Sequence, residues 1–428
     1  MRSAAKPFDL ERLPTVAEAR LRLLQALPPY RPPEEQVPLA QALGRVLARE
    51  VRAAQDIPAF ARSLVDGYAL RAEDVAPARD PEVPLTVRGR VRMGHAAAAV
   101  VGPQEAVWVP TGGMVPPGAD AVVPVEQTMP AGDAAGPDGL PGAITVRACV
   151  RPGDNVLPAA ADAAAGEVVL RPGRRLRPQD VGVLASVGCL VPWVYRRPVV
   201  AILSTGDELV PPDREPGLGQ VRDANAYSLA SAVQADGGVP LLLGIVADDA
   251  GAWRRALVEA LDCDLVLVSG GSSVGLDDVA GDVLASFGPP GVLVHGVRMA
   301  PGKPTILALI GDRPVFGLPG NPVSALIAYD LFVRPALRWR MGCLPAGPWH
   351  PVVRARLARP IHAPRGRELH ARVRLTVVDG EVVAEPLPGG SAQLGSLARA
   401  DGLVTVPLER GSLPAGETVE VRLLFDPA

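Results

Sequence analysis

The sequence has 428 residues, too many for one ordinary hydrophobic core, so we expect two to four domains. Its 43 basic and 46 acidic residues leave a net charge of −3 without a basic run, which argues against a nucleic-acid-binding protein. Four scattered cysteines without a CxxC pair, and no apolar run near the ~20 residues of a membrane span, predict a soluble, cytoplasmic protein with reduced thiols.

The first part of the chain is predicted to be helical. Thr15 and Glu18 form a capping-box pattern, which predicts a helix from there to about Leu27. Apolar residues that share one helical face predict a second, amphipathic helix over 38–51. A further helical pattern covers 177–187.

The predicted secondary structure changes from helical to β-rich at residue 56. Short β-rich runs such as 84–91 and 106–110, broken by Pro and Gly, predict an inserted β-rich domain. Two polar turns stand out in it, one with Asp66 beside a glycine and one with Thr111 before two glycines. Ordinary turn chemistry explains each of them taken separately.

Strands alternate with helices in the next part of the chain. This alternation predicts a parallel, doubly wound sheet with right-handed crossovers. The strands are expected near 199–203, 239–245, 265–268, 292–294, 305–310 and 315–317, and the helices near 225–236, 250–261, 278–287 and 322–340.

One turn in this α/β part has the pattern of a ligand site. The apolar run 265–268 leads into Gly270 and Gly271, and Asp277 and Asp278 follow at the start of a helix. Ligands of open α/β sheets bind beyond the carboxyl ends of the strands, where glycines let backbone N–H groups approach an anion. An ordinary turn capped by aspartates would have the same sequence.

Two other strand ends repeat this arrangement. Asp207 and Glu208 follow a Ser-Thr-Gly turn, and Asn321 and Pro322 suit the N-cap and first position of a long helix. Three polar strand ends imply one shared crevice.

The last part of the chain is predicted to be all β. The segment 375–387 contains the Asp-Gly pair of a two-residue hairpin turn, and two more β-rich runs follow it. The fold class is therefore multidomain α/β plus β. We expect a discontinuous helical and linker domain, an inserted β-rich domain, an α/β domain and a small C-terminal β-barrel, over residues 1–55 with 167–195, 56–166, 196–346 and 347–428 respectively.

Several common chemistries have no motif here. The sequence lacks GxxxxGK[ST], a GxGxxG after a strand and HExxH, and its five histidines show no metal-ligand spacing. The carboxylates on glycine turns suit Mg²⁺ and a phosphorylated ligand better than nucleophilic catalysis.

Nine motifs in order resemble one family, the molybdopterin molybdotransferases, which include bacterial MoeA and the E domain of gephyrin. They are ALGRVLAREV, VDGYAL, TGGMVPPGADAVVPVE, STGDELV, GQVRDAN, GIVADD, VSGGSSVG, PGKPT and GLPGNPVSA, and the resemblance covers nearly the whole chain. It implies that residues 196–346 bind molybdopterin. The implied reaction inserts molybdenum from molybdate into adenylylated molybdopterin with Mg²⁺-dependent release of AMP. The resemblance also implies a homodimer that contacts the upstream adenylyltransferase and molybdoenzymes.

The resemblance also implies roles for individual residues. Functional positions that we assign to catalysis are Asp66, Thr111, Asp162, Asp248 and Asp278. Positions expected to bind the pterin nucleotide or the oxyanion are Glu208, Gly270, Gly271, Ser272, Lys303, Pro319, Asn321, Pro322 and Ser391, with Glu208 and Asp278 as ligands of Mg²⁺.

Some positions depart from the family pattern. Ala61 and Arg62 stand where the family has Asp-Asn, the run 157–162 replaces an Arg-rich segment, and Gly296 and Ala300 replace basic residues before PGKP. Arg298 and Lys303 remain, and Arg298 is the expected substitute for the missing cations. These losses leave open an alternative, a diverged paralogue that binds or delivers a nucleotide-pterin without efficient metal insertion. A third hypothesis, an assembly scaffold, has no receptor-binding feature to support it.

Overall fold

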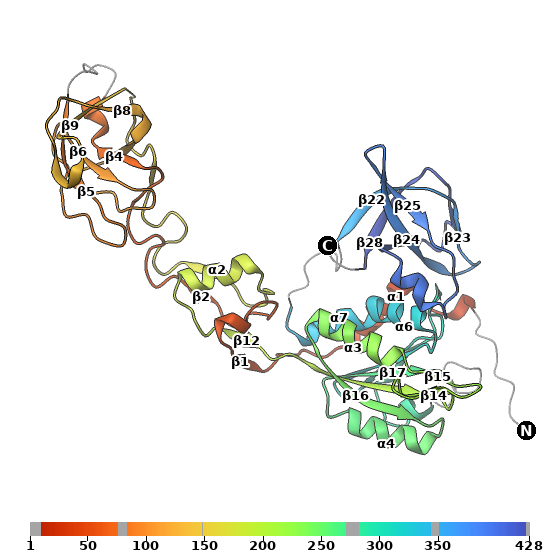
Figure 1. Ribbon diagram of the computed structural model, residues 1–428. Coiled ribbons are helices and arrows are strands. Elements are labelled where there is room, and N and C mark those ends of the chain that lie inside the picture. Colours follow the sequence, from red (N-terminus) through yellow and green to blue (C-terminus); the bar gives the residue numbers. More distant parts are fainter. Residues whose placement is uncertain (1–9, 76–83, 148, 271–281, 344–350, 425–428) are drawn as a thin grey trace, which may run out of the picture.

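The computed structural model describes residues 10–75, 84–147, 149–270, 282–343 and 351–424. The molecule is elongated, with the inserted β-rich part at one end and the α/β sheet and C-terminal barrel at the other (Figure 1). In the described part of the chain, no helix has the length and apolar character needed to cross a bilayer. The four cysteines are free thiols.

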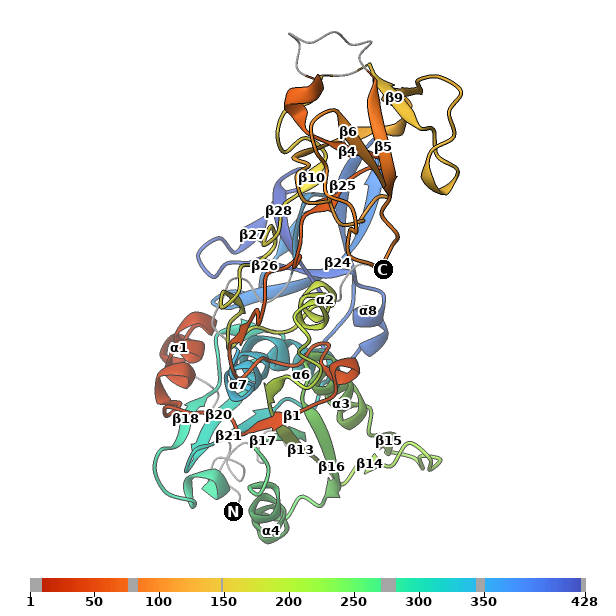
Figure 2. The ribbon, with the colours of Figure 1, turned by 90° about the vertical axis from the view of Figure 1, so that its left-hand side faces the viewer.

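The first helix, α1 (Val16–Ala26), begins as predicted. Thr15 N donates to Glu18 Oε2 at 2.8 Å and Glu18 N donates to Thr15 Oγ1 at 3.2 Å, which completes the capping box. Its buried Val16 and Leu23 join the core of the α/β sheet, and Figure 2 shows α1 beside β18 and β20 of that sheet.

The second predicted helix, over 38–51, is wrong. The segment forms only one 3-10 turn, η2 (Leu39–Gln41), because Gly44 adopts a left-handed φ of +73° that ends any helical path. Val46 and Leu47 instead enter β-bridges and are buried there. The apolar spacing that suggested a helix therefore belongs to an irregular extended segment.

Short pairings build the linker between the two ends of the molecule. β1 (Glu34–Gln36) pairs with β12 (Trp193–Tyr195), and β2 (Val51–Arg52) pairs with β11 (Val168–Leu170). The predicted third helix is confirmed as α2 (Pro178–Ser186), and Leu184 of α2 lies in a small core with residues of β2, β11 and β12.

The inserted part contains a six-stranded sheet of order β7-β4-β6-β5-β9-β8. On β4, Tyr68 and Leu70 belong to one hydrophobic cluster and Ala69 to another, which is the alternation expected when a strand is covered on both faces. The strands are β4 (Gly67–Leu70), β5 (Leu85–Arg90), β6 (Glu105–Val109), β7 (Ala121–Pro124), β8 (Thr128–Pro130) and β9 (Ala143–Val146), and β3 (Arg62–Ser63) pairs with β10 (Val156–Leu157) beside them.

The α/β part has a six-stranded sheet of order β16-β13-β17-β21-β20-β18. Its strands are β13 (Val199–Thr205), β16 (Val239–Val246), β17 (Leu265–Gly270), β18 (Gly291–His295), β20 (Ile306–Ile310) and β21 (Arg313–Leu318). The prediction of an all-parallel sheet is wrong at β20, which is antiparallel to both of its neighbours. A tight turn through Gly311 (φ +59°) leaves no room for a crossover helix between β20 and β21.

Helices cover both faces of this sheet. α3 (Asn225–Asp236) and the continuous helix α6 (Pro322–Ala328), η6 (Tyr329–Val333) and α7 (Arg334–Arg340) lie on one face, and α4 (Ala250–Ala260) lies on the other (Figure 1). Two separate hydrophobic cores, one on each face, confirm the doubly wound architecture.

The C-terminal part is a closed five-stranded barrel, because β24 pairs with both β25 and β26. Asp379 and Gly380 have φ values of +52° and +79°, so the predicted hairpin turn is confirmed. The barrel strands are β22 (Val352–Leu357), β24 (Glu368–Val378), β25 (Glu381–Pro386), β26 (Gly402–Val406) and β28 (Thr418–Leu423), with β23 (Ile361–His362), β27 (Ser412–Leu413) and α8 (Leu394–Ala398) attached. β19 (Met299–Ala300) pairs with β24 and joins the barrel to the α/β part.

Candidate active site

A cavity of about 500 Å³ lies at the carboxyl ends of β13 and β17, where the sequence predicts a crevice. We call it the strand-end cavity. It is lined by Thr205, Gly206, Glu208, Leu209, Val221, Arg222, Asp223, Ala224, Asn225, Asp248, Ser269, Gly270, Gly320, Asn321, Pro322 and Ala392. The structure thus brings together five of the residues predicted from the sequence: Glu208, Asp248, Gly270, Asn321 and Pro322.

Glycine is required where β13 and β17 end. Gly270 has φ +114°, and a Cβ at this position would lie 2.0 Å from the carbonyl oxygen of Thr205. Gly206 has φ +147°, and a Cβ there would lie 2.5 Å from Glu208 Oε2. The two glycines therefore keep the strand ends close together and let the Glu208 carboxylate fold over its own turn.

Asn225 connects the start of α3 to two other segments that line the cavity. Its Nδ2 donates to Ser269 Oγ at 2.8 Å, at the end of β17, and to the Gly320 carbonyl oxygen at 2.8 Å, in the loop after β21. Asp223 accepts from Ala226 N at 3.0 Å and so holds the start of α3. The sequence interpretation assigned no role to these residues, and the only signal for them was the motif GQVRDAN.

The carboxylates of the cavity repel one another. Asp248 N donates to Asp207 Oδ1 at 3.3 Å. Burial raises the pKa of the Asp248 carboxyl, and the negative charges of Asp207 and Glu208 raise that pKa further. Asp248 Oδ1 is buried and has no hydrogen-bond partner in the described structure, so it can accept from a bound ligand.

The described residues do not contain a set of three His, Cys, Asp or Glu side chains arranged to hold a metal ion. Glu208 is in the cavity, but the other predicted ligand, Asp278, lies outside the described residues, as do Gly271 and Ser272. Mg²⁺ commonly takes only one or two carboxylates and completes its shell with water and substrate phosphates. The unpaired Asp248 oxygen beside Glu208 fits such a partial set.

A second cavity, of about 220 Å³, adjoins the first, and Asn321 lines both. We call it the PGKP cavity. It is lined by Met299, Ala300, Pro301, Gly302, Lys303, Pro304, Pro319, Asn321, Ser324, Arg367 and Ser391. The predicted residues Lys303, Pro319, Asn321 and Ser391 therefore meet here, although Ser391 comes from the barrel part of the chain.

Asn321 takes the predicted N-cap position and also contacts the barrel. It occupies the N-cap position of α6, with Pro322 following, but its side chain makes no capping hydrogen bond. Its Nδ2 donates to Ser391 Oγ at 3.0 Å, and Val323 N donates to the Ser391 carbonyl oxygen at 3.1 Å. The start of α6 is thus fastened to the barrel across the PGKP cavity.

The cations of the PGKP cavity are Lys303 and Arg367. The buried Nε of Arg367 has no hydrogen-bond partner among the described residues. Arg298, the expected substitute for missing family cations, lines neither cavity, and its Nε donates to the Gly366 carbonyl oxygen at 3.3 Å. Sequence reasoning missed Arg367 because it lies in the barrel part, 64 positions after Lys303.

The remaining predicted residues lie in or near the inserted part. Thr111 N and Thr111 Oγ1 donate to Asp66 Oδ1 at 2.6 and 3.0 Å, so these two predicted residues form one polar unit. Asp162 is exposed, and its backbone N donates to the Ile57 carbonyl oxygen. Within one chain the inserted part lies at the opposite end of the molecule from the α/β sheet (Figure 1), so the structure does not bring Asp66 and Thr111 together with Glu208.

Comparisons with known proteins agree with this geometry. Three family models match, namely the MoeA N-terminal region (domain I and II) at residues 14–188, a probable molybdopterin binding domain at 201–339, and the MoeA C-terminal region (domain IV) at 354–424.

Individual relatives match over most of their length. Molybdopterin molybdenumtransferase 2 of Mycobacterium tuberculosis (strain CDC 1551 / Oshkosh) is 36% identical over 90% of this chain and 94% of that protein. The molybdopterin molybdenumtransferase of Nostoc sp. (strain PCC 7120 / SAG 25.82 / UTEX 2576) is 35% identical over 90% of this chain and 88% of that protein. A crystal structure of the molybdopterin biosynthesis MoeA protein from Pyrococcus horikoshii OT3 has a TM-score of 0.77 and 32% identity, and the match covers 96% of this chain and 100% of that one. The chain therefore belongs to the MoeA family of molybdopterin molybdenumtransferases.

Proposed function

We propose that this protein inserts molybdenum from molybdate into adenylylated molybdopterin and releases AMP, as a step of molybdenum cofactor biosynthesis. The observation that carries this proposal is the pair of adjoining cavities that share Asn321. One is lined by glycine turns and carboxylates, and the other is lined by two cations and two serines. A phosphoanhydride and a tetrahedral oxyanion need these two environments side by side.

The strand-end cavity suits the nucleotide phosphates. Glycine turns at the strand ends let backbone N–H groups approach a phosphate closely. Mg²⁺ bound beside Glu208 and Asp248 would neutralise the negative charge that develops when the anhydride is hydrolysed. Asp248, whose pKa is raised by burial and by neighbouring carboxylates, is suited to hold or accept a proton of the attacking water.

The PGKP cavity suits molybdate. Lys303 and Arg367 supply positive charge, and the Ser391 hydroxyl group can donate to an oxyanion oxygen while it accepts from Asn321 Nδ2. The Arg367 guanidinium compensates in part for the uncharged Ala300, which also lines this cavity. Charge-assisted hydrogen bonds of this kind are worth about 1.5–3 kcal/mol each.

The first test is release of AMP from adenylylated molybdopterin by the purified protein. We expect release that requires both Mg²⁺ and molybdate, and we expect Asp248→Asn and Lys303→Gln to abolish most of it. A matched control is Asp262→Asn, because Asp262 is an exposed aspartate that lines neither cavity. Release that does not require molybdate would contradict the proposed insertion.

The alternative function, a paralogue that binds or delivers a nucleotide-pterin, is favoured by Ala300 in the oxyanion cavity. It predicts tight binding of the adenylylated pterin without AMP release. Transfer of the product to a molybdenum-free apoenzyme separates the two functions, because only an insertase reconstitutes the activity of that apoenzyme.

We propose further that two copies of the chain build each active site. Asp66 and Thr111 form a polar unit at the far end of the molecule from the strand-end cavity, so they can join that cavity only in a second subunit. A symmetric dimer would contain two such shared sites.

Mixing two inactive variants tests this arrangement. If Asp66→Ala and Glu208→Gln act on the same shared site, a heterodimer has one site with both defects and one intact site. Random mixing then restores about a quarter of the wild-type activity. Absence of any restoration in a mixture whose subunits have exchanged would refute the shared site.

A further inference from the structure

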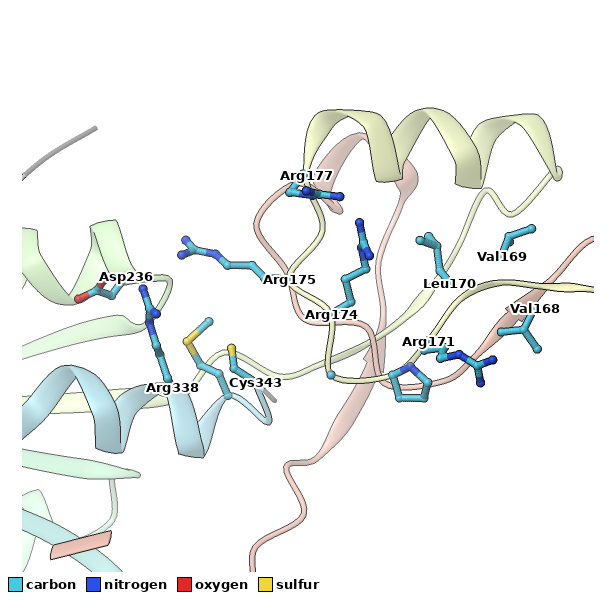
Figure 3. A pocket seen from close by; sticks show the side chains of 13 residues that line it. Val168, Val169, Leu170, Arg171, Arg174, Arg175, Arg177, Asp236, Arg338 and Cys343 are labelled. Carbon is cyan, nitrogen blue, oxygen red and sulfur yellow. The ribbon is translucent and has the colours of Figure 1, made fainter. Parts of the chain in front are cut away.

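A third cavity, of about 780 Å³, lies away from the proposed active site and shares no lining residue with it. We call it the arginine cavity. It lies between the linker segment 168–177 and the end of α7 (Figure 3). Its lining is Val168, Val169, Leu170, Arg171, Pro172, Gly173, Arg174, Arg175, Arg177, Asp236, Arg338, Met341 and Cys343.

Positive charge dominates this lining. It contains five arginines and one carboxylate, that of Asp236. Asp236 Oδ2 already accepts from Tyr329 Oη and from Arg334 Nε, both at 2.8 Å. The Asp236 carboxylate is therefore shared between Arg338 of the lining and groups outside it, and one carboxylate leaves the five arginines with an excess of positive charge.

A buried aspartate holds two of the five arginines. Asp180 forms ion pairs with Arg174 at 2.8 Å and with Arg177 at 3.1 Å. Burial by itself raises the pKa of Asp180, but the hydrogen bonds from Arg174 and Arg177 outweigh it and lower the pKa to about 2. Asp180 therefore stays charged and fixes this side of the cavity.

Arg175 and Arg338 lie on opposite sides of the space. Figure 3 shows Arg175 extending from the linker segment and Arg338 rising from α7 into the gap between them. Arg175 makes two long hydrogen bonds, from Nε to the Gly44 carbonyl oxygen at 3.3 Å and from Nη2 to the Ala235 carbonyl oxygen at 3.4 Å. Burial lowers the pKa of Arg338; Asp236 opposes this, and the charges of Arg334 and Arg175 add to it. An anion between the two guanidinium groups would relieve their mutual repulsion.

We propose that the arginine cavity is a binding site for a small molecule that carries a tetrahedral dianion of the phosphate class. The planar guanidinium group presents a fork of N–H donors that matches the oxygens of such an anion. Leu170, Met341 and Cys343 add apolar surface beside the arginines. The volume lies within the range of small-molecule sites, roughly 300–1,000 Å³. This site is independent of the proposed molybdenum insertion.

Titration calorimetry on the full-length protein tests the proposal, with inorganic phosphate and phenyl phosphate as probes. We expect saturable binding that weakens as salt is added. Arg175→Gln and Arg338→Gln should each weaken it about tenfold or more, since each removes one charge-assisted contact. Tighter binding of phenyl phosphate would assign the site to a phosphate ester, and equal affinities would assign it to the free ion.

Two controls separate this site from other anion binding. Arg374→Gln changes an exposed arginine on the barrel and should leave the affinity unchanged. Lys303→Gln removes phosphate that binds in the PGKP cavity, and the binding that remains should keep its affinity and still be weakened by Arg175→Gln. Arg175 is exposed, so Arg175→Gln is expected to fold even if Arg338→Gln does not. Unchanged affinity in Arg175→Gln, no saturable binding of either probe, or equal weakening by Lys303→Gln would overturn the proposal.

Discussion

Two adjacent aspartates, Asp248 and Asp249, should have opposite effects on stability. Asp248 lies near two other carboxylates. Burial raises its pKa, and the negative charges of Asp207 and Glu208 raise it further. Asp249 caps α4, because its Oδ1 accepts from Ala252 N at 2.7 Å. We therefore expect Asp248→Asn to stabilise the protein at neutral pH and Asp249→Ala to destabilise it.

The structure sets the size of both effects. Asp248 is partly open to solvent, and interactions between such partly exposed charges are worth about 0.2–1 kcal/mol, so Asp248→Asn should stabilise the protein by about that amount. Loss of the helix cap costs about 1 kcal/mol. The apparent midpoint of thermal unfolding should rise by about 1–3 °C in Asp248→Asn and fall by a similar amount in Asp249→Ala.

The pH dependence follows from the sign of the pKa shift. Folding raises the pKa of the Asp248 carboxyl, so its ionised form destabilises the folded state. The free energy of unfolding of the wild type therefore falls as the pH rises through the raised pKa. The advantage of Asp248→Asn should be full at pH 7 and disappear as the pH falls below the ordinary value of 3.8. High salt should shrink it as well.

Thermal unfolding at several pH values and two salt concentrations, followed by the AMP-release assay, measures these effects. We expect Asp248→Asn to be more stable and inactive, because strained carboxylates are retained where function needs them. Two results would refute repulsion between Asp248 and its neighbouring carboxylates. One is an Asp248→Asn protein that is less stable than the wild type, and the other is a stability difference between the two proteins that does not change between pH 7 and pH 4.

Three further changes test other parts of the structure. Asp180→Asn should destabilise the protein by about 1–2 kcal/mol in chemical unfolding at pH 7, and the wild type should lose this contribution as the pH falls from 3.8 towards about 2. Gly270→Ala places a Cβ 2.0 Å from a carbonyl oxygen at φ +114°, so we expect a loss of about 2 kcal/mol or more and an unfolding midpoint at lower temperature. Ser391→Ala removes the acceptor of Asn321 Nδ2, and the KM for molybdate in AMP release should rise about tenfold while Asp262→Asn leaves it unchanged.

Local patterns in the sequence predicted the elements whose geometry is local. The Thr15 capping box, the Asp379-Gly380 turn and the start of α6 at Pro322 are confirmed, because each depends on residues within a few positions of one another. The strand ends with glycine were recognised for the same reason. The wrong helix over 38–51 had suitable apolar spacing, but Gly44 and the bridges to a distant segment decided its conformation.

Contacts between distant segments decided the rest of the site. Ser391 and Arg367 reach the PGKP cavity only because the barrel packs against the α/β part, and nothing near them in the sequence marks that approach. The antiparallel orientation of β20, by contrast, follows from a local feature, the tight turn through Gly311, which the alternation of strands and helices did not distinguish from a crossover.

The sequence by itself determined the alternation of strands and helices in the α/β part, the glycine turns with their carboxylates and the resemblance to the MoeA family, because these depend on the identity and spacing of neighbouring residues. Only the tertiary structure decided that two cavities meet at Asn321, that Arg367 supplies a cation there and that five arginines gather in a third cavity. Each of these cavities forms where segments that are distant in the sequence pack together. The spacing of neighbouring residues does not reveal which distant segments will meet.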